Sequence, residues 1–253
     1  MRAARREDRR EATRQRILDA AMRLLAEGGW EGLTIAKLAS ELDYAVGALY
    51  RYFDGKDAIL MSLQGRVVER MIADMKRALK AADALIADHP EAEAEDAALL
   101  RVRAALGVYE TLPLRRPTDF KLLAFTLGEP RELVDEKRLD PGKLPPFRML
   151  LAGMGAQLIA AASVGALRRG DTARRAIRLW GAMQGVLQLG KLGRFEGTLS
   201  DPLLAEELVE DLLAGFGADR DRLARVRVDA RRILMDLDAP PQPSTPSTLS
   251  KNA

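Results

Sequence analysis

The chain has 253 residues, of which 47% are hydrophobic and 30% charged, and a formal net charge of +3, which suits a globular protein with a sizeable core. Cysteine is absent, so disulfides and thiol chemistry are excluded, as is typical of a protein in the reducing cytoplasm. No apolar run approaches the ~20 residues that span a bilayer, and no apolar segment follows the charged N-terminus, so we expect a cytoplasmic protein without a signal peptide or a membrane partner.

Positive charge is concentrated at the N-terminus. Residues 1–16 contain seven arginines and only three acidic side chains, Glu7, Asp8 and Glu11. We interpret residues 1–12 as a basic N-terminal arm that can lie along nucleic-acid phosphates. The alternative is a solvated, frayed terminus with no partner, and composition alone does not separate the two.

Helical periodicity dominates the rest of the chain. Alanine, leucine and arginine are abundant, β-branched residues are sparse and no long stretch alternates as a strand does, so we predict an all-α fold. The first helix is expected over residues 13–27, because apolar residues recur there at three- and four-residue steps and Gly28 and Gly29 follow.

Residues 34–56 have the pattern of a helix-turn-helix. Thr34 is the expected N-cap of a second helix that ends near Asp43. A short third helix over residues 45–52 then carries Leu49 and Phe53 inward and leaves most of its surface outward. Two short helices joined by a tight turn can place the second of them in a DNA major groove.

A long helix is predicted to follow, with Asp54 as its N-cap and apolar residues recurring to about Asp83 or beyond. At ~1.5 Å per residue it is ~40 Å long and links the N-terminal unit to the rest of the chain. Further helices are expected over residues 94–111, 118–127, 146–168, 171–192 and 200–215, with an accessory helix over 219–236. The proline- and serine-rich residues 238–253 are expected to be disordered.

Three sequence blocks within residues 14–60 carry a family resemblance. They read R-I-L-D-A-A-M-R-L-L-A-E-G-G-W, L-T-I-A-K-L-A-S-E-L and G-A-L-Y-R-Y-F-D-G-K-D-A-I-L. Their order and spacing resemble the DNA-binding domain of TetR-family transcriptional regulators. The resemblance implies a DNA-binding domain over residues 13–60 and a helical effector-binding and dimerisation domain over residues 61–237. It also implies a homodimeric repressor that a small-molecule effector releases from a palindromic operator.

The resemblance further implies which residues meet double-stranded DNA. Thr34, Tyr50 and Lys56 match phosphate-contacting positions, which agrees with the affinity of helix N-termini and positive charge for anions. The third helix would present its first residues to the bases, with Arg51 as its remaining polar reader. The full set of expected DNA contacts is Thr34, Ala45, Val46, Ala48, Tyr50, Arg51, Tyr52 and Lys56.

The expected groove face departs from the family pattern. Relatives usually have glycine at the position of Asp43, and often serine at Ala45 and threonine at Ala48. Losing the serine cap costs the third helix about 1 kcal/mol. Alanine and valine can touch thymine methyl groups but cannot hydrogen-bond bases, so we expect more weight on Arg51, on DNA shape and on the basic arm. The alternative, a purely structural three-helix unit, leaves the outward Tyr50 unexplained.

Residues 99–189 mix apolar side chains with a few polar ones, as in a ligand cavity of a helical bundle. Ordinary core with polar edges is the alternative. No clear charge lies within the apolar stripes, so we expect a small apolar or amphipathic effector. The candidate effector-binding residues are Tyr109, Phe120, Phe125, Met149, Gln157, Trp180 and Gln184.

The resemblance implies that residues 180–192 and 202–213 form the dimer interface. Both segments carry wide apolar faces, and Gly181 and Gly185 would let helices approach closely, although internal packing could use the same faces. A homodimer would place two reading heads ~35 Å or a little more apart.

Enzyme chemistry is not indicated. The single histidine, His89, precedes a proline in an expected loop, and there is no Gly-rich phosphate loop. The acidic residues at 91–96 lack a partner histidine, so we predict no metal site and no cofactor. A DNA-binding regulator without an effector, controlled by a protein partner or by its abundance, remains an alternative, as does an enzyme or lipid carrier on a helical scaffold. A well-formed cavity would favour the effector.

Overall fold

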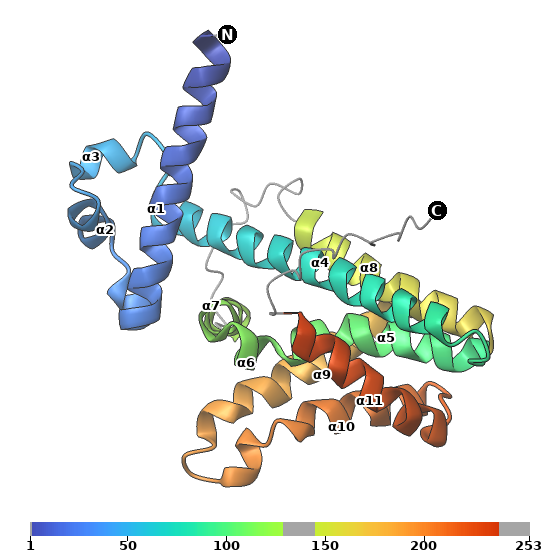
Figure 1. Ribbon diagram of the computed structural model, residues 1–253. Coiled ribbons are helices and arrows are strands. Elements are labelled where there is room, and N and C mark those ends of the chain that lie inside the picture. The colour runs from blue at the N-terminus through green and yellow to red at the C-terminus, as the bar shows by residue number, and fades with distance from the viewer. Residues whose placement is uncertain (1, 129–144, 238–253) are drawn as a thin grey trace, which may run out of the picture.

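The structure, a computed structural model, describes residues 2–128 and 145–237; the expected disordered tail, 238–253, lies outside them. The described residues form α-helices and short 3-10 helices and no strand, so the all-α prediction is confirmed. Helices α1 to α3 form a small unit at one end of the long helix α4, and several of the later helices pack along the rest of it (Figure 1).

Helix α1 spans Arg2–Gly32 and is interrupted at Gly29, whose φ of 60° lies in the left-handed region. The expected start at residue 13 was therefore wrong, because residues 2–12 continue the same helix rather than forming a separate arm. Arginine, alanine and glutamate are good helix formers, and no glycine or proline precedes Gly28. The glycine pair breaks the helix as expected, and a further turn brings Trp30 to a half-buried position.

Helices α2 (Ile35–Glu41) and α3 (Val46–Leu49) pack with α1 and the start of α4 around a small apolar core. Ile17, Leu38, Leu49 and Leu60 are each exposed by 1% or less. Burying such a side chain fully contributes about 1.5–3 kcal/mol to stability. This packing holds α3 in place against the neighbouring helices.

Helix α4 spans Lys56–Asp88, so its 33 residues cover roughly 50 Å. Its N-cap is Gly55, with a φ of 118° and no side-chain cap, so the expected cap by Asp54 was wrong. The helix contributes to the cores of both domains and is the continuous element between them (Figure 1).

The second domain contains the remaining helices, close to their expected ranges. None of the described helices is long and apolar enough to cross a membrane. The elements are α5 (Ala94–Glu110), α6 (Leu112–Arg115), α7 (Pro117–Gly128), α8 (Pro145–Ser163), α9 (Thr172–Leu189), the 3-10 helices Gly190–Leu192 and Gly197–Ser200, α10 (Leu203–Gly215) and α11 (Arg220–Asp236).

Helix α5 is the centre of this domain, since every residue from Ala97 to Glu110 except Arg101 is buried. The predicted accessory helix α11 covers it. Arg222 and Arg225 pair with Asp96 near the start of α5, at 2.6 Å and 3.0 Å. The last helix is therefore part of the folded domain rather than an appendage.

Candidate functional site

The start of α2 is built as expected. Thr34 has extended backbone angles, and its Oγ1 accepts a hydrogen bond of 3.1 Å from the backbone N–H of Lys37. The side chain is exposed, so its hydroxyl proton can be donated outward. An exposed N-cap hydroxyl beside free helix N–H groups is a suitable contact for a phosphate.

The turn between α2 and α3 depends on Asp43, which has a φ of 54°. This left-handed conformation favours glycine and is tolerated by aspartate better than by most residues. The turn closes when the N–H of Tyr44 donates to the carbonyl of Ala39 at 2.9 Å. The position where relatives carry glycine is thus the one that requires a positive φ.

Helix α3 is short and lacks a side-chain cap. Its N-cap, Ala45, has extended backbone angles and no hydroxyl to offer the following N–H groups. The α-helical hydrogen bonding ends at Leu49, three residues before the expected end, and the chain continues in turns. Helix α3 therefore begins without the side-chain cap that a serine at position 45 would supply.

The outer surface of α3 is open. Val46 and Tyr50 are 46% and 53% exposed, Ala45 and Arg51 are exposed, and Ala48 is half-buried. Except for Arg51 and the Tyr50 hydroxyl, this surface offers no side-chain hydrogen-bond donor. The face that we expect to meet the groove is thus exposed and offers few polar groups, and its contact with DNA stays a prediction.

Tyr52, also expected at the DNA, is half-buried and packs against the core. Arg14 of α1 donates a 2.5 Å hydrogen bond from Nη1 to the Tyr52 carbonyl, and its guanidinium lies 4.3 Å from the Phe53 ring centre. Arg14 therefore fastens the end of the α3 region to α1.

Lys56 is placed differently from its expected role. Its Nζ donates to the carbonyl of Trp30 at 2.8 Å and lies 3.5 Å from the centre of the Trp30 ring. Burial lowers the pKa of Lys56, against the opposing effects of Glu31 and Asp57. The ammonium group thus contacts Trp30 in this structure, and the expected contact of Lys56 with a phosphate stays a prediction.

Trp30 also joins the two domains. Its ring stacks on that of Phe125 in α7, with centroids 5.1 Å apart and an angle of 27° between the planes. Lys56 and Phe125 thus both contact the Trp30 ring, at the junction of α1, α4 and α7. This contact between α1 and α7 spans nearly a hundred residues of sequence.

A cavity of about 530 Å³ lies between α6, α7, α9 and the start of α10. Its size is in the range of small-molecule sites, and its lining is mostly apolar. Gln188 crosses beside it, donating to the Ala124 carbonyl at 2.8 Å. The lining includes Glu110, which pairs with Arg103, and the exposed Asp201, together with Leu114, Phe120, Lys121, Ala124, Phe125, Val186, Leu187, Gln188, Lys191, Leu199, Pro202 and Ala205.

Two of the seven expected effector residues, Phe120 and Phe125, line this cavity. Behind them, the buried Tyr109 ring lies 6.4 Å from Phe120 and 6.3 Å from Trp180. Burial raises the pKa of Tyr109, and its hydroxyl has no hydrogen-bond partner among the described residues. The buried amide of Gln184 is likewise unpartnered there.

Met149 and Gln157 lie on α8 and do not line this cavity, so the structure does not bring them together with Phe120 and Phe125, and their role as effector contacts stays a prediction. Met149 is 55% exposed and Gln157 is half-buried. The sequence reasoning missed Lys121 and Lys191, two exposed lysines of the lining. In the sequence, the only indication that Lys121 lines the cavity was its proximity to Phe120 and Phe125 on one predicted helix.

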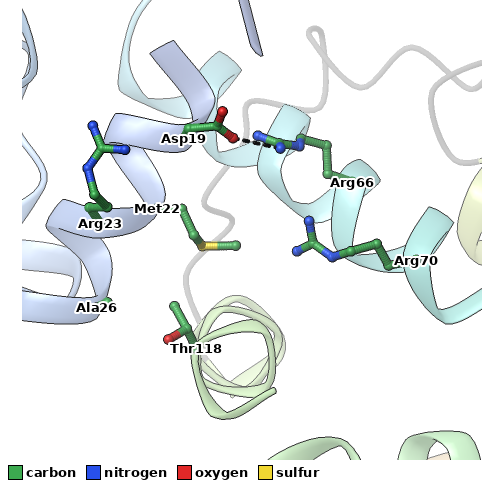
Figure 2. A pocket seen from close by; sticks show the side chains of 7 residues that line it. All are labelled: Asp19, Met22, Arg23, Ala26, Arg66, Arg70 and Thr118. Carbon is green, nitrogen blue, oxygen red and sulfur yellow. Dashed lines mark hydrogen bonds and ion pairs between the residues drawn. The ribbon is translucent and has the colours of Figure 1, made fainter. Parts of the chain in front are cut away.

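A second hollow, of about 340 Å³, separates α1 from α4 and α7 (Figure 2). Three arginines line it, and each is paired with a carboxylate. Arg66 meets Asp19 at 2.7 Å across the domain boundary. Arg23 pairs with Glu41 at 2.8 Å, and Arg70 with Asp119 at 2.6 Å. Because all three positive charges are matched, this hollow is a boundary between domains rather than an open anion site.

Ion pairs also fasten the α6–α7 segment to α4. The Asp74 carboxylate, 2% exposed, accepts hydrogen bonds from Arg115 at 2.9 Å and Arg116 at 2.7 Å. Burial raises the pKa of Asp74, but hydrogen bonds from Arg77 and Arg115 and the charge of Arg116 outweigh it, so the pKa lies below its ordinary value. Together with the Arg70–Asp119 pair, this cluster ties one wall of the cavity to the helix that carries α1–α3.

The histidine and carboxylate side chains of the described residues are dispersed. Within residues 2–128 and 145–237, no group of three histidine, cysteine or carboxylate side chains could hold a metal ion. His89 is exposed and lies 3.2 Å from Glu91.

Comparison with known proteins shows which family the N-terminal domain resembles. The model of "Bacterial regulatory proteins, tetR family" matches residues 17–63. The repressor KstR of Mycolicibacterium smegmatis is 45% identical over 65 residues, which are 26% of this chain and 32% of KstR. The fatty acid metabolism regulator protein of Bacillus subtilis is 37% identical over 73 residues, 27% of this chain and 38% of that protein. The matched stretch thus spans about a third of the length of these relatives.

Solved structures extend the similarity to the whole fold. A tetR-family regulatory protein from Rhodococcus RHA1 has a TM-score of 0.56 at 20% identity, covering 81% of this chain and 97% of that one. FadR from Bacillus subtilis in complex with stearoyl-CoA has the same TM-score and identity, covering 79% and 98%. Both curated relatives are transcriptional regulators by name. Residues 17–63 thus match the DNA-binding domain of tetR-family regulators, and the chain as a whole shares its fold with solved structures of that family.

Proposed function

We propose that the protein is a DNA-binding transcriptional repressor that acts as a homodimer on a palindromic operator. The observation that carries this proposal is the open surface of α3, where Val46, Tyr50 and Arg51 face outward beside the N-terminus of α2. A helix covered by other elements could not enter a groove, whereas α3 stands free on a well-packed core. The KstR repressors matched by the N-terminal domain support the same role.

The chemistry of α3 predicts how the operator is read. Val46 and Ala48 can contact thymine methyl groups, and Arg51 can donate to guanine. Thr34 and Tyr50 position the helix through phosphates and carry no sequence information themselves. Specificity should therefore rest on a few base pairs in each half-site and on DNA shape.

In vitro selection of random DNA by the purified protein tests the proposal. We expect a palindrome whose half-sites are centred about one helical turn or a little more apart. Arg51→Ala should weaken binding by about 1–3 kcal/mol and relax the preference at one position of each half-site. Selected DNA without a common motif would refute sequence-specific binding.

We further propose that the 530 Å³ cavity binds a small amphipathic effector. Its aromatic and aliphatic lining suits an apolar body, and the exposed Lys121 and Lys191 suit an anionic end group. In FadR of Bacillus subtilis the bound molecule is stearoyl-CoA, which has this amphipathic character. The existence of a ligand-sized cavity favours this reading over a regulator without an effector.

Helix α7 offers a route from the cavity to the DNA-binding domain. Phe125 both lines the cavity and stacks on Trp30 of α1. On the same segment, Asp119 pairs with Arg70 of α4. An effector that displaces α7 would move α1 and α4 together and change the separation of the two reading heads. A preference of ~2–3 kcal/mol for the shifted state suffices for tens to hundreds of fold in operator affinity.

The proposed dimer interface is formed by α9 and α10, which pack against each other. Large apolar side chains remain exposed on them in the single chain, with Ile177 at 55%, Leu189 at 44% and Leu203 at 42%. A stable dimer would bury such side chains. Analytical ultracentrifugation tests this, and Ile177→Glu with Leu203→Glu should yield monomers.

Operator binding in the presence of palmitate and of stearoyl-CoA tests the effector proposal. Binding of either compound should be lost when Ala124→Trp fills the cavity. If a compound saturates the protein and leaves operator affinity unchanged, the proposed release mechanism is wrong. If neither compound binds, an effector of this chemical class is refuted, and control by a protein partner or by abundance becomes the favoured reading.

A further inference from the structure

The N-terminal half of α1 extends beyond the domain that it helps to build (Figure 1). The first buried residue of the helix is Ile17, while residues 5–12 are all exposed. The helix is regular until Gly29, so this projecting part continues the direction of the buried part. About two turns of exposed helix thus project beyond the DNA-binding domain.

Positively and negatively charged side chains lie on opposite faces of this exposed part of α1. At 100° per residue, the five arginines on one side fall within an arc of about 140°, and the three acidic residues fall on the opposite side. Arg14 lies outside the arginine arc and is held by the Tyr52 carbonyl. The arginine face consists of Arg5, Arg6, Arg9, Arg10 and Arg16, and the acidic face of Glu7, Asp8 and Glu11.

The arginine face continues the line of the buried face of α1. Residues eleven apart in an α-helix are about three turns apart and share nearly one face. Arg6 and Arg10 therefore lie in line with Ile17 and Ala21, which are buried in the hydrophobic core. Arg6 and Ile17, like Arg10 and Ala21, are roughly 16 Å apart along the helix axis. The basic side chains therefore project from the exposed end of the helix whose buried part belongs to the DNA-binding domain.

The arginine face has no partner within the described part of the chain. None of its five guanidiniums forms an ion pair there, whereas Arg23, Arg66 and Arg70 are all paired. Like charges at i and i+4, as at Arg5 with Arg9 and Arg6 with Arg10, destabilise an isolated helix. A row of arginines without acidic partners suits a binding partner that carries regularly repeated negative charge.

We propose that this arginine face binds the phosphate backbone of the operator, outside the groove that α3 enters. The inference rests on the proposed DNA-binding function and assigns it a second contact surface. Phosphate contacts supply affinity without sequence information, which offsets the sparse groove face of Val46 and Ala48. A membrane surface is not the partner, because the projection has no large apolar side chain to insert beside its arginines.

The test is the salt dependence of operator binding. Arg6→Gln, Arg9→Gln and Arg10→Gln are combined, because glutamine keeps the helix propensity of arginine. The slope of log K against log salt should become shallower by about 0.9 for each phosphate that is no longer bound, up to about 2.7 per bound protomer. Circular dichroism verifies that the variant keeps its helical content.

Two matched variants separate local contact from general charge. Arg169→Gln, Arg174→Gln and Arg232→Gln remove the same charge from exposed sites of the second domain and should keep the wild-type slope. Arg6→Lys, Arg9→Lys and Arg10→Lys should also keep it. If the N-terminal glutamine variant matches the slope of the second-domain control, the inference is overturned while the proposed function stands. If the wild-type protein binds no selected DNA, both fall.

Discussion

The stacked pair of Trp30 and Phe125 predicts a measurable coupling between the two domains. The perturbation is a double-mutant cycle with Trp30→Leu, Phe125→Leu and the combined variant. The ring centroids are 5.1 Å apart, and such pairs contribute about 0.5–1.5 kcal/mol beyond their buried area. Both side chains are half-buried, so we expect a coupling energy of about 0.5–1 kcal/mol. The interaction of Lys56 with the Trp30 ring is absent from both Trp30 variants and cancels in the cycle.

Urea unfolding of the four proteins, followed by far-ultraviolet circular dichroism, gives the free energies. The matched control is the same cycle with Phe120→Leu, because Phe120 is on α7 but its ring lies near Tyr109. That cycle should be additive to within ~0.3–0.5 kcal/mol. If the Trp30–Phe125 cycle is equally additive, the stack does not join the domains energetically, and the proposed route through α7 to α1 is refuted.

Three further substitutions test individual contacts. Leu49→Ala should cost about 2–5 kcal/mol of stability by calorimetry and abolish operator binding, because Leu49 anchors α3 at 1% exposure; an unchanged melting temperature would contradict this. Asp74→Asn should cost roughly 2–4 kcal/mol near pH 7. Since the folded-state pKa of Asp74 is lowered, the wild-type advantage should be complete above about pH 4 and disappear at lower pH; a constant difference in pH-dependent urea titrations would refute it. Lys56→Gln should lower the free energy of unfolding by about 1 kcal/mol, because the Lys56 ammonium donates to the Trp30 carbonyl. The same variant should leave the slope of log K against log salt unchanged; a shallower slope would show that Lys56 contacts a phosphate.

Local chemistry made much of the DNA-binding domain predictable. The capping role of Thr34 follows from one side chain and the residues directly after it. The apolar spacing placed Leu49 inward and left Tyr50 and Arg51 outward, as the structure shows. Glycine and proline likewise marked the helix ends well, because these residues change the allowed backbone angles directly.

Contacts between distant segments were not predictable in the same way. Lys56 turns inward because the ring and carbonyl of Trp30 lie above it, a meeting that no periodicity in the sequence encodes. Met149 and Gln157 shared the composition of a cavity lining, but the packing of α8 leaves them away from the described cavity. The length of α1 was underestimated because its charged first turns carry no apolar stripe.

A single charge on the outer surface of α3 tests the central claim most directly. Val46→Glu places a carboxylate where we expect the major groove, at a side chain that is 46% exposed and contributes little to the core. Val228→Glu on α11 is the control, since Val228 is 71% exposed and far along the chain from α3. Fluorescence anisotropy with selected operator DNA should show binding abolished in Val46→Glu and retained in Val228→Glu, with both proteins folded. Wild-type affinity in Val46→Glu would contradict the proposal that α3 reads the DNA.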